Sequence, residues 1–182
     1  MQGKIKIAWG ITGSGDKIRE IFEMMSKLSK NNDDKYDVEI FVSKSGEQVL
    51  KYYKLINLLK LNFNKIWIEK DANTPFLAGR LQSGEFKLLF VAPATSNTVA
   101  KVAHGISDTM LTNGIIQALK VYVPVFIMPS DLNEGMTTTV LPNNRILKIR
   151  IRKEDANNVK TISSMDGITI IEKIEDIKHI FE

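Results

Sequence analysis

The feature that most constrains this chain is an uncharged apolar run that ends in a cluster of hydroxyl and amide side chains. Residues 88–92 read Leu-Leu-Phe-Val-Ala and are followed by Pro93, Ala94, Thr95, Ser96, Asn97 and Thr98. The run predicts a strand buried on both faces of a parallel sheet, and Pro93, which cannot donate a backbone hydrogen bond, predicts its end. Open α/β sheets bind ligands just beyond the carboxyl ends of their strands. The cluster therefore predicts a ligand site, although Thr95 or Ser96 could instead serve only to cap the following helix.

The order of strand and helix signals predicts an α/β fold. Apolar or alternating runs between polar turns predict strands at residues 4–9, 36–42, 66–69, 87–92, 123–128, 145–152 and 167–171. Apolar residues at helical spacing predict helices at residues 16–30, 47–53, 76–83, 96–104, 108–120, 153–165 and 174–181. This alternation predicts a doubly wound, mostly parallel sheet flanked by helices, a Rossmann-like fold, with the strand at 145–152 exposed on one face. The 182 residues contain no linker and no repeat, so we expect a single domain.

Composition excludes several classes of chemistry. The chain has no cysteine, which rules out structural disulfides, thiolate zinc sites, cysteine-ligated iron–sulfur clusters and a cysteine nucleophile. Redox chemistry would therefore require a bound organic cofactor. The net charge is +4, but the lysines are spread along the chain with no basic run between aromatic residues, which argues against nucleic acid as a partner. We expect a cytoplasmic protein that does not associate with membranes, because the sequence has no signal peptide and no long apolar run.

A glycine-rich turn follows the first predicted strand and precedes a helix. Backbone N–H groups and the helix dipole attract a phosphate at such a place, and Thr12 and Ser14 add hydroxyl donors. A dinucleotide-binding turn is normally followed by an acidic residue at the end of the second strand, where this chain has Ser43 and Lys44. These groups suit a phosphate, so the pattern favours a mononucleotide over NAD; the alternative is a tight turn that binds nothing. The candidate binding residues here are Gly10, Thr12, Gly13, Ser14, Ser43 and Lys44.

Two further polar residues are predicted to be structural. His104 falls in the last turn of a predicted helix, where it would interact with the helix dipole. Asp108 precedes the next predicted helix and is expected to be its N-cap.

The segment Pro93–Thr98, together with Ala103-His104-Gly105-Ile106-Ser107-Asp108, resembles the signature of a known family. This family is the FMN-binding flavoproteins, which include the cysteine decarboxylases of coenzyme A and lantibiotic synthesis. The opening segment Ile7–Gly15 is most similar to its archaeal branch, the archaeoflavoproteins and the dihydromethanopterin reductases (acceptor). The resemblance extends from Lys4 to about Met136. It implies one flavoprotein domain over residues 1–182.

The resemblance also implies a cofactor and an assembly. FMN phosphate would lie over Gly10, Thr12, Gly13 and Ser14 with Ser43 near it, and Thr95, Ser96 and Asn97 would contact the ribityl chain or the flavin ring. Members of this type form trimers or larger homo-oligomers with flavin at subunit contacts. A neighbouring subunit is therefore expected to complete the site.

Departures from the family pattern favour electron transfer. Where the decarboxylases have a histidine, this chain has Gly79, flanked by Ala78 and Arg80. Their substrate clamp is altered by one inserted residue within Pro129–Met136. We therefore expect no catalytic side chain of the decarboxylase type and an FMN-dependent oxidoreductase that transfers electrons.

The expected electron donor is a small acidic iron–sulfur protein such as ferredoxin. A basic stripe is its predicted docking face, with a solvated strand edge as the alternative. The stripe comprises Arg145, Lys148, Arg150, Arg152 and Lys153. Other open functions are a dihydromethanopterin reductase (acceptor), which would bind a pterin on the flavin, an FMN-dependent decarboxylase or prenyltransferase-like protein, and a degenerate flavin-binding protein.

Overall fold

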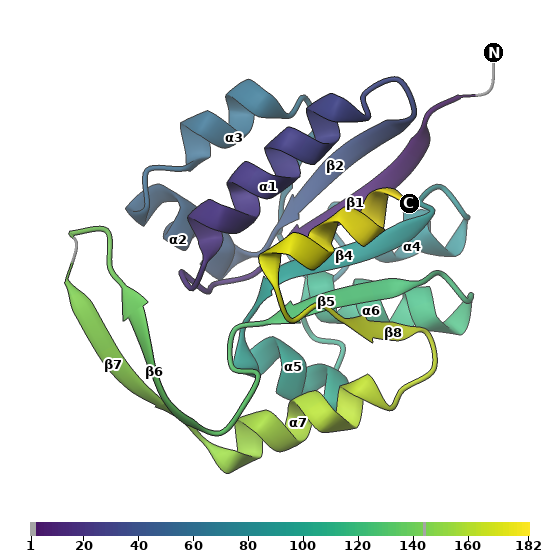
Figure 1. The fold of residues 1–182 in the computed structure, drawn as a ribbon. Helices are drawn as coiled ribbons and strands as arrows, with labels where there is room; N and C mark the ends of the chain where they lie inside the picture. Colours follow the sequence, from purple (N-terminus) through teal and green to yellow (C-terminus); the bar gives the residue numbers. More distant parts are fainter. Residues whose placement is uncertain (1–2, 144) are drawn as a thin grey trace.

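A six-stranded parallel sheet forms the centre of the chain (Figure 1). The computed structural model describes residues 3–143 and 145–182. The strand order is β3-β2-β1-β4-β5-β8. These strands are β1 (Ile5–Ile11), β2 (Tyr36–Val42), β3 (Ile66–Ile68), β4 (Leu88–Ala94), β5 (Val125–Pro129) and β8 (Ile168–Ile170). The predicted doubly wound parallel sheet is confirmed.

Helices cover both faces of this sheet. One face packs against α1 (Ile18–Asn31), α2 (Lys44–Tyr52), α3 (Ile56–Asn62) and the 3-10 helix η1 (Ile174–Phe181). The other face packs against α4 (Leu77–Gln82), α5 (Ser96–Ala103), α6 (Met110–Lys120) and α7 (Lys153–Ser163). Alternate residues of β1 divide between the two cores, with Ile7 and Trp9 on the first face and Ala8 on the second. A strand buried on both faces explains the uninterrupted apolar runs of the sequence.

The remaining two strands form a separate antiparallel hairpin. Strand β6 (Gly135–Val140) pairs with β7 (Ile146–Ile151), and Thr137 lies opposite Ile149. Figure 1 shows the hairpin apart from the main sheet, on the side where β4 and β5 end. The sequence predicted β7 but not β6. The prediction that β7 is exposed on one face is wrong, because residues from both faces are exposed and only Ile151 is buried.

Several predicted boundaries are also corrected. Strand β4 continues through Pro93 to Ala94 after a shift in register, and the Pro93 carbonyl still accepts hydrogen bonds although its nitrogen cannot donate one. Helix α2 begins three residues earlier than predicted, and α3 was not predicted. The N-cap of α6 is Thr109, whose side chain accepts from the Thr112 N–H, and not Asp108 as predicted. Asp108 instead pairs with Lys101. Among the described residues, no helix is long and apolar enough to span a membrane.

Candidate functional site

The turns after β1 and β4 meet where the chain changes direction across the sheet. After β1 the strand order runs through β2 to β3, and β4 then pairs with the opposite edge of β1, which is the position where open α/β sheets bind ligands. The Thr12 hydroxyl donates to the Pro93 carbonyl oxygen at 2.7 Å and accepts from the Thr95 N–H at 2.9 Å. Thr12 is only 2% exposed. Its hydroxyl therefore joins the two turns and is not the free phosphate donor that the sequence suggested.

Three helices begin near these turns, α2 after β2, α5 after β4 and α6 after α5, and each has a hydroxyl side chain at its N-cap. Ser43 accepts from the third residue of α2, Gly46, at 2.9 Å. Thr95 accepts from the N–H of Thr98 in α5 at 3.2 Å, and Thr109 forms a capping box with Thr112 in α6. Thr95 therefore caps α5, which the alternative interpretation of this cluster expected of Thr95 or Ser96. The positive ends of α2, α5 and α6 all face this region.

A first cavity of about 230 Å³ lies between these helix starts. It is lined by Thr12, Gly13, Ser43, Ser45, Glu69, Thr95, Asn97, Thr98, Thr109 and Leu111. Within the described chain, the backbone N–H groups of Gly13, Ser45, Asn97 and Leu111 have no hydrogen-bond acceptor. Unpaired N–H groups at helix starts form a favourable environment for an anion. We call this the anion cavity.

Glu69 is one of four residues of the anion cavity that sequence reasoning missed, together with Ser45, Thr109 and Leu111. It directly follows β3 and is 9% exposed. One carboxylate oxygen accepts from the Lys44 N–H at 2.9 Å and the other from the Met110 N–H at 2.7 Å. A single buried carboxylate therefore bridges the first residues of α2 and α6. No local sequence pattern signals this role, because its partners lie 25 and 41 residues away.

A second cavity of about 290 Å³ shares Thr95 with the first. Polar residues from the strand ends line one part of it, namely Ser14, Gly15, Asp16, Ser96, Ser130 and Asp131. The remaining wall comes from Tyr53 and from the hairpin and its tip, through Thr137, Thr139, Leu141 and Ile149. We call this the mixed cavity, because hydroxyl and carboxylate groups there oppose aliphatic side chains.

Carboxylates give the mixed cavity an acidic character. Burial, with a smaller contribution from the nearby Asp131, raises the pKa of Asp16 above its ordinary value despite the opposing effect of Lys17. The Ser96 hydroxyl donates to Asp131, and the hydroxyls of Ser14 and Ser130 are 2.6 Å apart. Among the described residues, no Lys or Arg lines either cavity.

The predicted binding residues divide between the two cavities. Those in the anion cavity are Thr12, Gly13, Ser43, Thr95, Asn97 and Thr98. Ser14 and Ser96 line the mixed cavity, which Thr95 also borders. Four predicted residues of the described chain line neither cavity, namely Gly10, Lys44, Pro93 and Ala94. Gly10 lies within β1, and a Cβ there would be 2.7 Å from Leu111.

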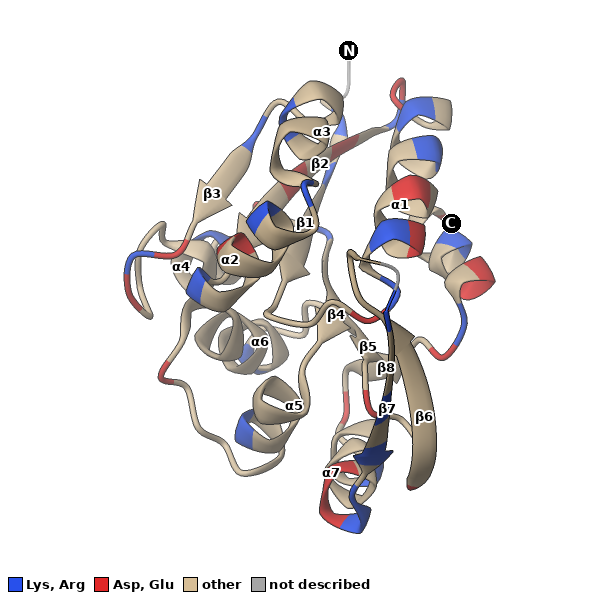
Figure 2. Cartoon of the chain, turned by 90° about the vertical axis from the view of Figure 1, so that its left-hand side faces the viewer, with Lys and Arg blue, Asp and Glu red and all other residues tan. Residues whose placement is uncertain are grey.

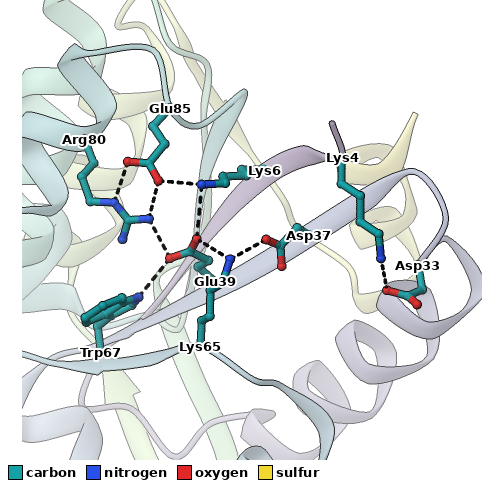
Figure 3. Close-up of polar contacts among 9 residues, drawn as sticks. All are labelled: Lys4, Lys6, Asp33, Asp37, Glu39, Lys65, Trp67, Arg80 and Glu85. Atoms are coloured by element: carbon teal, nitrogen blue, oxygen red, sulfur yellow. Dashed lines mark hydrogen bonds and ion pairs between the residues drawn. The ribbon is translucent and has the colours of Figure 1, made fainter. Parts of the chain in front are cut away.

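The position that matches the decarboxylase histidine lies outside both cavities. Gly79 is exposed on α4, and the neighbouring Arg80 forms ion pairs with the buried Glu39 and with Glu85 (Figure 3). In the described chain, neither His104 nor His179 lines the two cavities. His104 is the exposed residue that follows α5, in agreement with its predicted structural role.

The predicted basic stripe lies on and beside the hairpin. Lys148 and Arg150 are exposed and lie on one face of β7, opposite Thr138 and Met136 of β6. Ile149 lies between them in the sequence, on the other face of the strand, and lines the mixed cavity. Figure 2 shows basic residues along β7. Arg152 differs from them because it binds Asp155 at the start of α7, with its NH2 group 2.6 Å from Oδ1.

Comparison with known proteins identifies the family. The sequence profile of the Flavoprotein family matches residues 1–181, so the chain belongs to the flavoproteins. It is 47% identical over 176 residues to an uncharacterized protein of Methanocaldococcus jannaschii, covering 97% of this chain and 94% of the relative. It is also 41% identical over 145 residues to the dihydromethanopterin reductase (acceptor) of the same organism. That match covers 76% of this chain and 58% of the reductase.

A solved structure agrees with the sequence comparison. The FMN complex of DmrB from Burkholderia xenovorans, described as a cubic protein cage for redox transfer, matches with a TM-score of 0.82 and 29% identity. The match covers 100% of this chain and 95% of that protein. The predicted family and its Rossmann-like flavoprotein fold are thereby confirmed.

Proposed function

We propose that this flavoprotein binds FMN with the phosphate in the anion cavity. The observation that carries the proposal is that four residues lining this cavity, Gly13, Ser45, Asn97 and Leu111, have backbone N–H groups without an acceptor in the described chain. A phosphate monoester supplies oxygen acceptors for such groups, and three helix dipoles favour its negative charge. The FMN complex of the similar DmrB structure supports the same cofactor.

The mixed cavity is the proposed place for the remainder of the flavin. It adjoins the anion cavity at Thr95, and Leu141 and Ile149 supply apolar surface for a ring. Ser14 and Ser96 supply hydroxyl groups for the ribityl chain or ring edge. When bound, FMN supplies one- and two-electron redox chemistry, which this cysteine-free chain has no side chain to perform.

Comparison of FMN with riboflavin tests the phosphate assignment. The protein without bound flavin is titrated with each ligand, and quenching of flavin fluorescence gives the two Kd values. Because riboflavin lacks the phosphate, we expect it to bind at least about 100-fold more weakly, as for the loss of two charge-assisted hydrogen bonds. Inorganic phosphate should weaken FMN binding and leave riboflavin binding unchanged. Equal Kd values for the two flavins would exclude a phosphate site.

We further propose that the bound flavin accepts electrons from a small acidic protein such as ferredoxin. Lys148 and Arg150 on the outer face of the hairpin form the docking surface, and the opposite face of the same hairpin lines the mixed cavity. Opposite charges accelerate encounter between redox partners. Arg152 is left out of this surface, because its ion pair with Asp155 belongs to the start of α7.

Charge reversal tests the docking surface. The double variant Lys148→Glu/Arg150→Glu should slow bimolecular reduction of the flavin by reduced ferredoxin about ten-fold or more at low salt, and the difference should shrink as salt is added. The matched control is Lys87→Glu/Lys120→Glu, which reverses two exposed charges next to the amino end of β4 and at the end of α6. If both variants react equally fast, the hairpin is not the docking surface.

Reduction of a dihydropterin is the second candidate function. The 41% identical relative is a dihydromethanopterin reductase (acceptor), and the chain spans 58% of its length. Under this proposal, the protein reduced under anaerobic conditions is reoxidised by a dihydropterin, which the flavin spectrum reports. A decarboxylase function is less well supported, because the exposed Gly79 offers no acid–base group where the resemblance expects a histidine.

A homo-oligomer of three or more subunits is proposed as the functional assembly. Large apolar side chains are exposed at separate places, with Leu61 at 81%, Phe76 at 67% and Tyr122 at 86%. Burial of these side chains between subunits would remove apolar surface from water. The cubic cage of the similar DmrB supports this proposal. Light scattering during size-exclusion chromatography measures the assembly, and a monomer would contradict it.

A further inference from the structure

A negative charge is built into the cavity that the proposed function assigns to a phosphate. The carboxylate of Glu69 lines this cavity and accepts the N–H groups of Lys44 and Met110, the first residues of α2 and α6. Two like charges in one site repel each other. Among the described residues, no Lys or Arg lines the cavity to offset this charge. Glu69 therefore opposes the ligand that the surrounding N–H groups attract.

Glu69 is not the only side chain that holds the two helix starts in place. Ser43 already caps α2 through the N–H of Gly46, and Thr109 and Thr112 cap each other's backbone at the start of α6. The second residue of each helix, Ser45 or Leu111, keeps its N–H unpaired in the described chain. The contribution specific to Glu69 is therefore its charge and its occupation of the first N–H of each helix.

We propose that Glu69 is an internal anion that weakens binding of the cofactor phosphate and stabilises the empty cavity. The inference rests on the proposed function, in which FMN phosphate enters this cavity. Without flavin, the carboxylate supplies acceptors for two buried N–H groups that would otherwise be unsatisfied. With flavin, it repels the phosphate across a cavity of only about 230 Å³. The Kd for FMN is consequently higher than it would be with a neutral side chain at this position.

The variant Glu69→Gln tests this role, because it removes the charge with little change in shape. We expect the Kd for FMN to fall about ten-fold or more, while the Kd for riboflavin stays at the parent value. The amide oxygen can accept from only one of the two helix starts, so the flavin-free protein should also melt at a lower temperature. The control Glu47→Gln removes one negative charge from α2 outside the cavity, where Glu47 pairs with Lys51 at 2.7 Å, and should change neither Kd.

The variant Glu69→Asp tests the effect of the charge separately from the effect of side-chain length. It keeps the negative charge but shortens the side chain, so the flavin-free protein should be less stable while the Kd for FMN remains near the parent value. An unchanged or higher Kd for FMN in Glu69→Gln would overturn the inference. It would also be overturned if Glu69→Gln and Glu69→Asp bound FMN equally, or if both flavins changed in parallel. Equal binding of FMN and riboflavin by the parent protein would instead refute the phosphate assignment itself, and the inference with it.

Discussion

The cluster of charges around Glu39 leads to a sharp prediction about stability. Glu39 lies in the middle of β2 with 1% of its side chain exposed, and the Arg80 guanidinium bonds it at 2.7 Å (Figure 3). Arg80 also forms two hydrogen bonds to Glu85, at 2.8 and 2.7 Å, and lies 4.6 Å from the ring centre of Phe86. The substitution Arg80→Met keeps apolar contact with the ring but leaves the Glu39 carboxylate without its strongest cation.

The expected loss follows from what remains around Glu39. Removal of one partner from a buried ion pair costs roughly 3–5 kcal/mol, because the other charge stays buried. Lys65 remains 3.2 Å from the Glu39 carboxylate, and the Trp67 indole N–H remains 3.0 Å from it. We therefore expect the lower end of that range, about 3 kcal/mol. For a urea dependence of about 2 kcal/mol per molar, the unfolding midpoint shifts by roughly 1.5 M.

Urea unfolding of the flavin-free protein, followed by far-UV circular dichroism, measures this shift. The double variant Glu39→Gln/Arg80→Met should lose less stability than the sum of the two single variants, because a neutral amide does not require a cation. Neither residue lines the anion cavity or the mixed cavity, so the Kd for FMN should equal that of the parent. A loss below about 1 kcal/mol, or additive effects in the double variant, would refute the reasoning from buried charge.

Two further predictions concern acid stability and the glycine turn. Hydrogen bonds from Arg80 and Lys6 lower the pKa of Glu85 from 4.5 to about 2, so the ion pairs stabilise the fold fully above pH 4.5 and progressively less as the pH falls toward 2. Because the Glu85 side chain is 31% exposed, we expect these ion pairs to contribute about 1–2 kcal/mol to the free energy of unfolding. Urea titrations between pH 6 and pH 2 should show the loss of this contribution in the parent but not in Glu85→Gln. Gly13→Ala would place a Cβ 2.5 Å from that of Ser45 and should lower both stability and FMN affinity, whereas a Cβ at Gly79 meets no atom within 4 Å. Thermal unfolding and flavin titration of the two alanine variants check this difference, and equal behaviour would contradict it.

The main sheet could be predicted because its signals are local. Strand β2 has the predicted bounds, Tyr36–Val42, since an apolar run between polar turns fixes both ends. Strand β6 could not be found in this way. Its sequence, Gly-Met-Thr-Thr-Thr-Val, has no apolar alternation, and its order comes from pairing with β7, which begins six residues after β6 ends. The predicted end of β4 at Pro93 was wrong for a related reason. The Pro93 carbonyl oxygen accepts a hydrogen bond from Thr12, a residue 81 positions away.

The candidate site could be predicted in part for the same reason. Turns at strand ends are visible in the sequence, so Thr12, Gly13, Ser43 and Asn97, which line the anion cavity, were among the predicted residues. Leu111 was missed because the feature that suits an anion is its unpaired backbone N–H, which has no side-chain signature. Glu69 is a single acidic residue after a short strand, and only the three-dimensional fold brings it to α2 and α6. Residues that act through distant partners therefore lie beyond pattern reasoning.

Capping and ligand binding, treated as alternatives for the cluster after β4, are compatible at a helix start. The caps of α2, α5 and α6 all engage the third residue of the helix, at Gly46, Thr98 and Thr112. In the described chain, the second residue of each helix has an unpaired N–H and lines the anion cavity. One such group is ordinary, because every helix begins with unpaired N–H groups. Three such residues come together in one cavity because the strand order β2-β1-β4 places the ends of β2 and β4 on either side of β1, and α6 begins beside them.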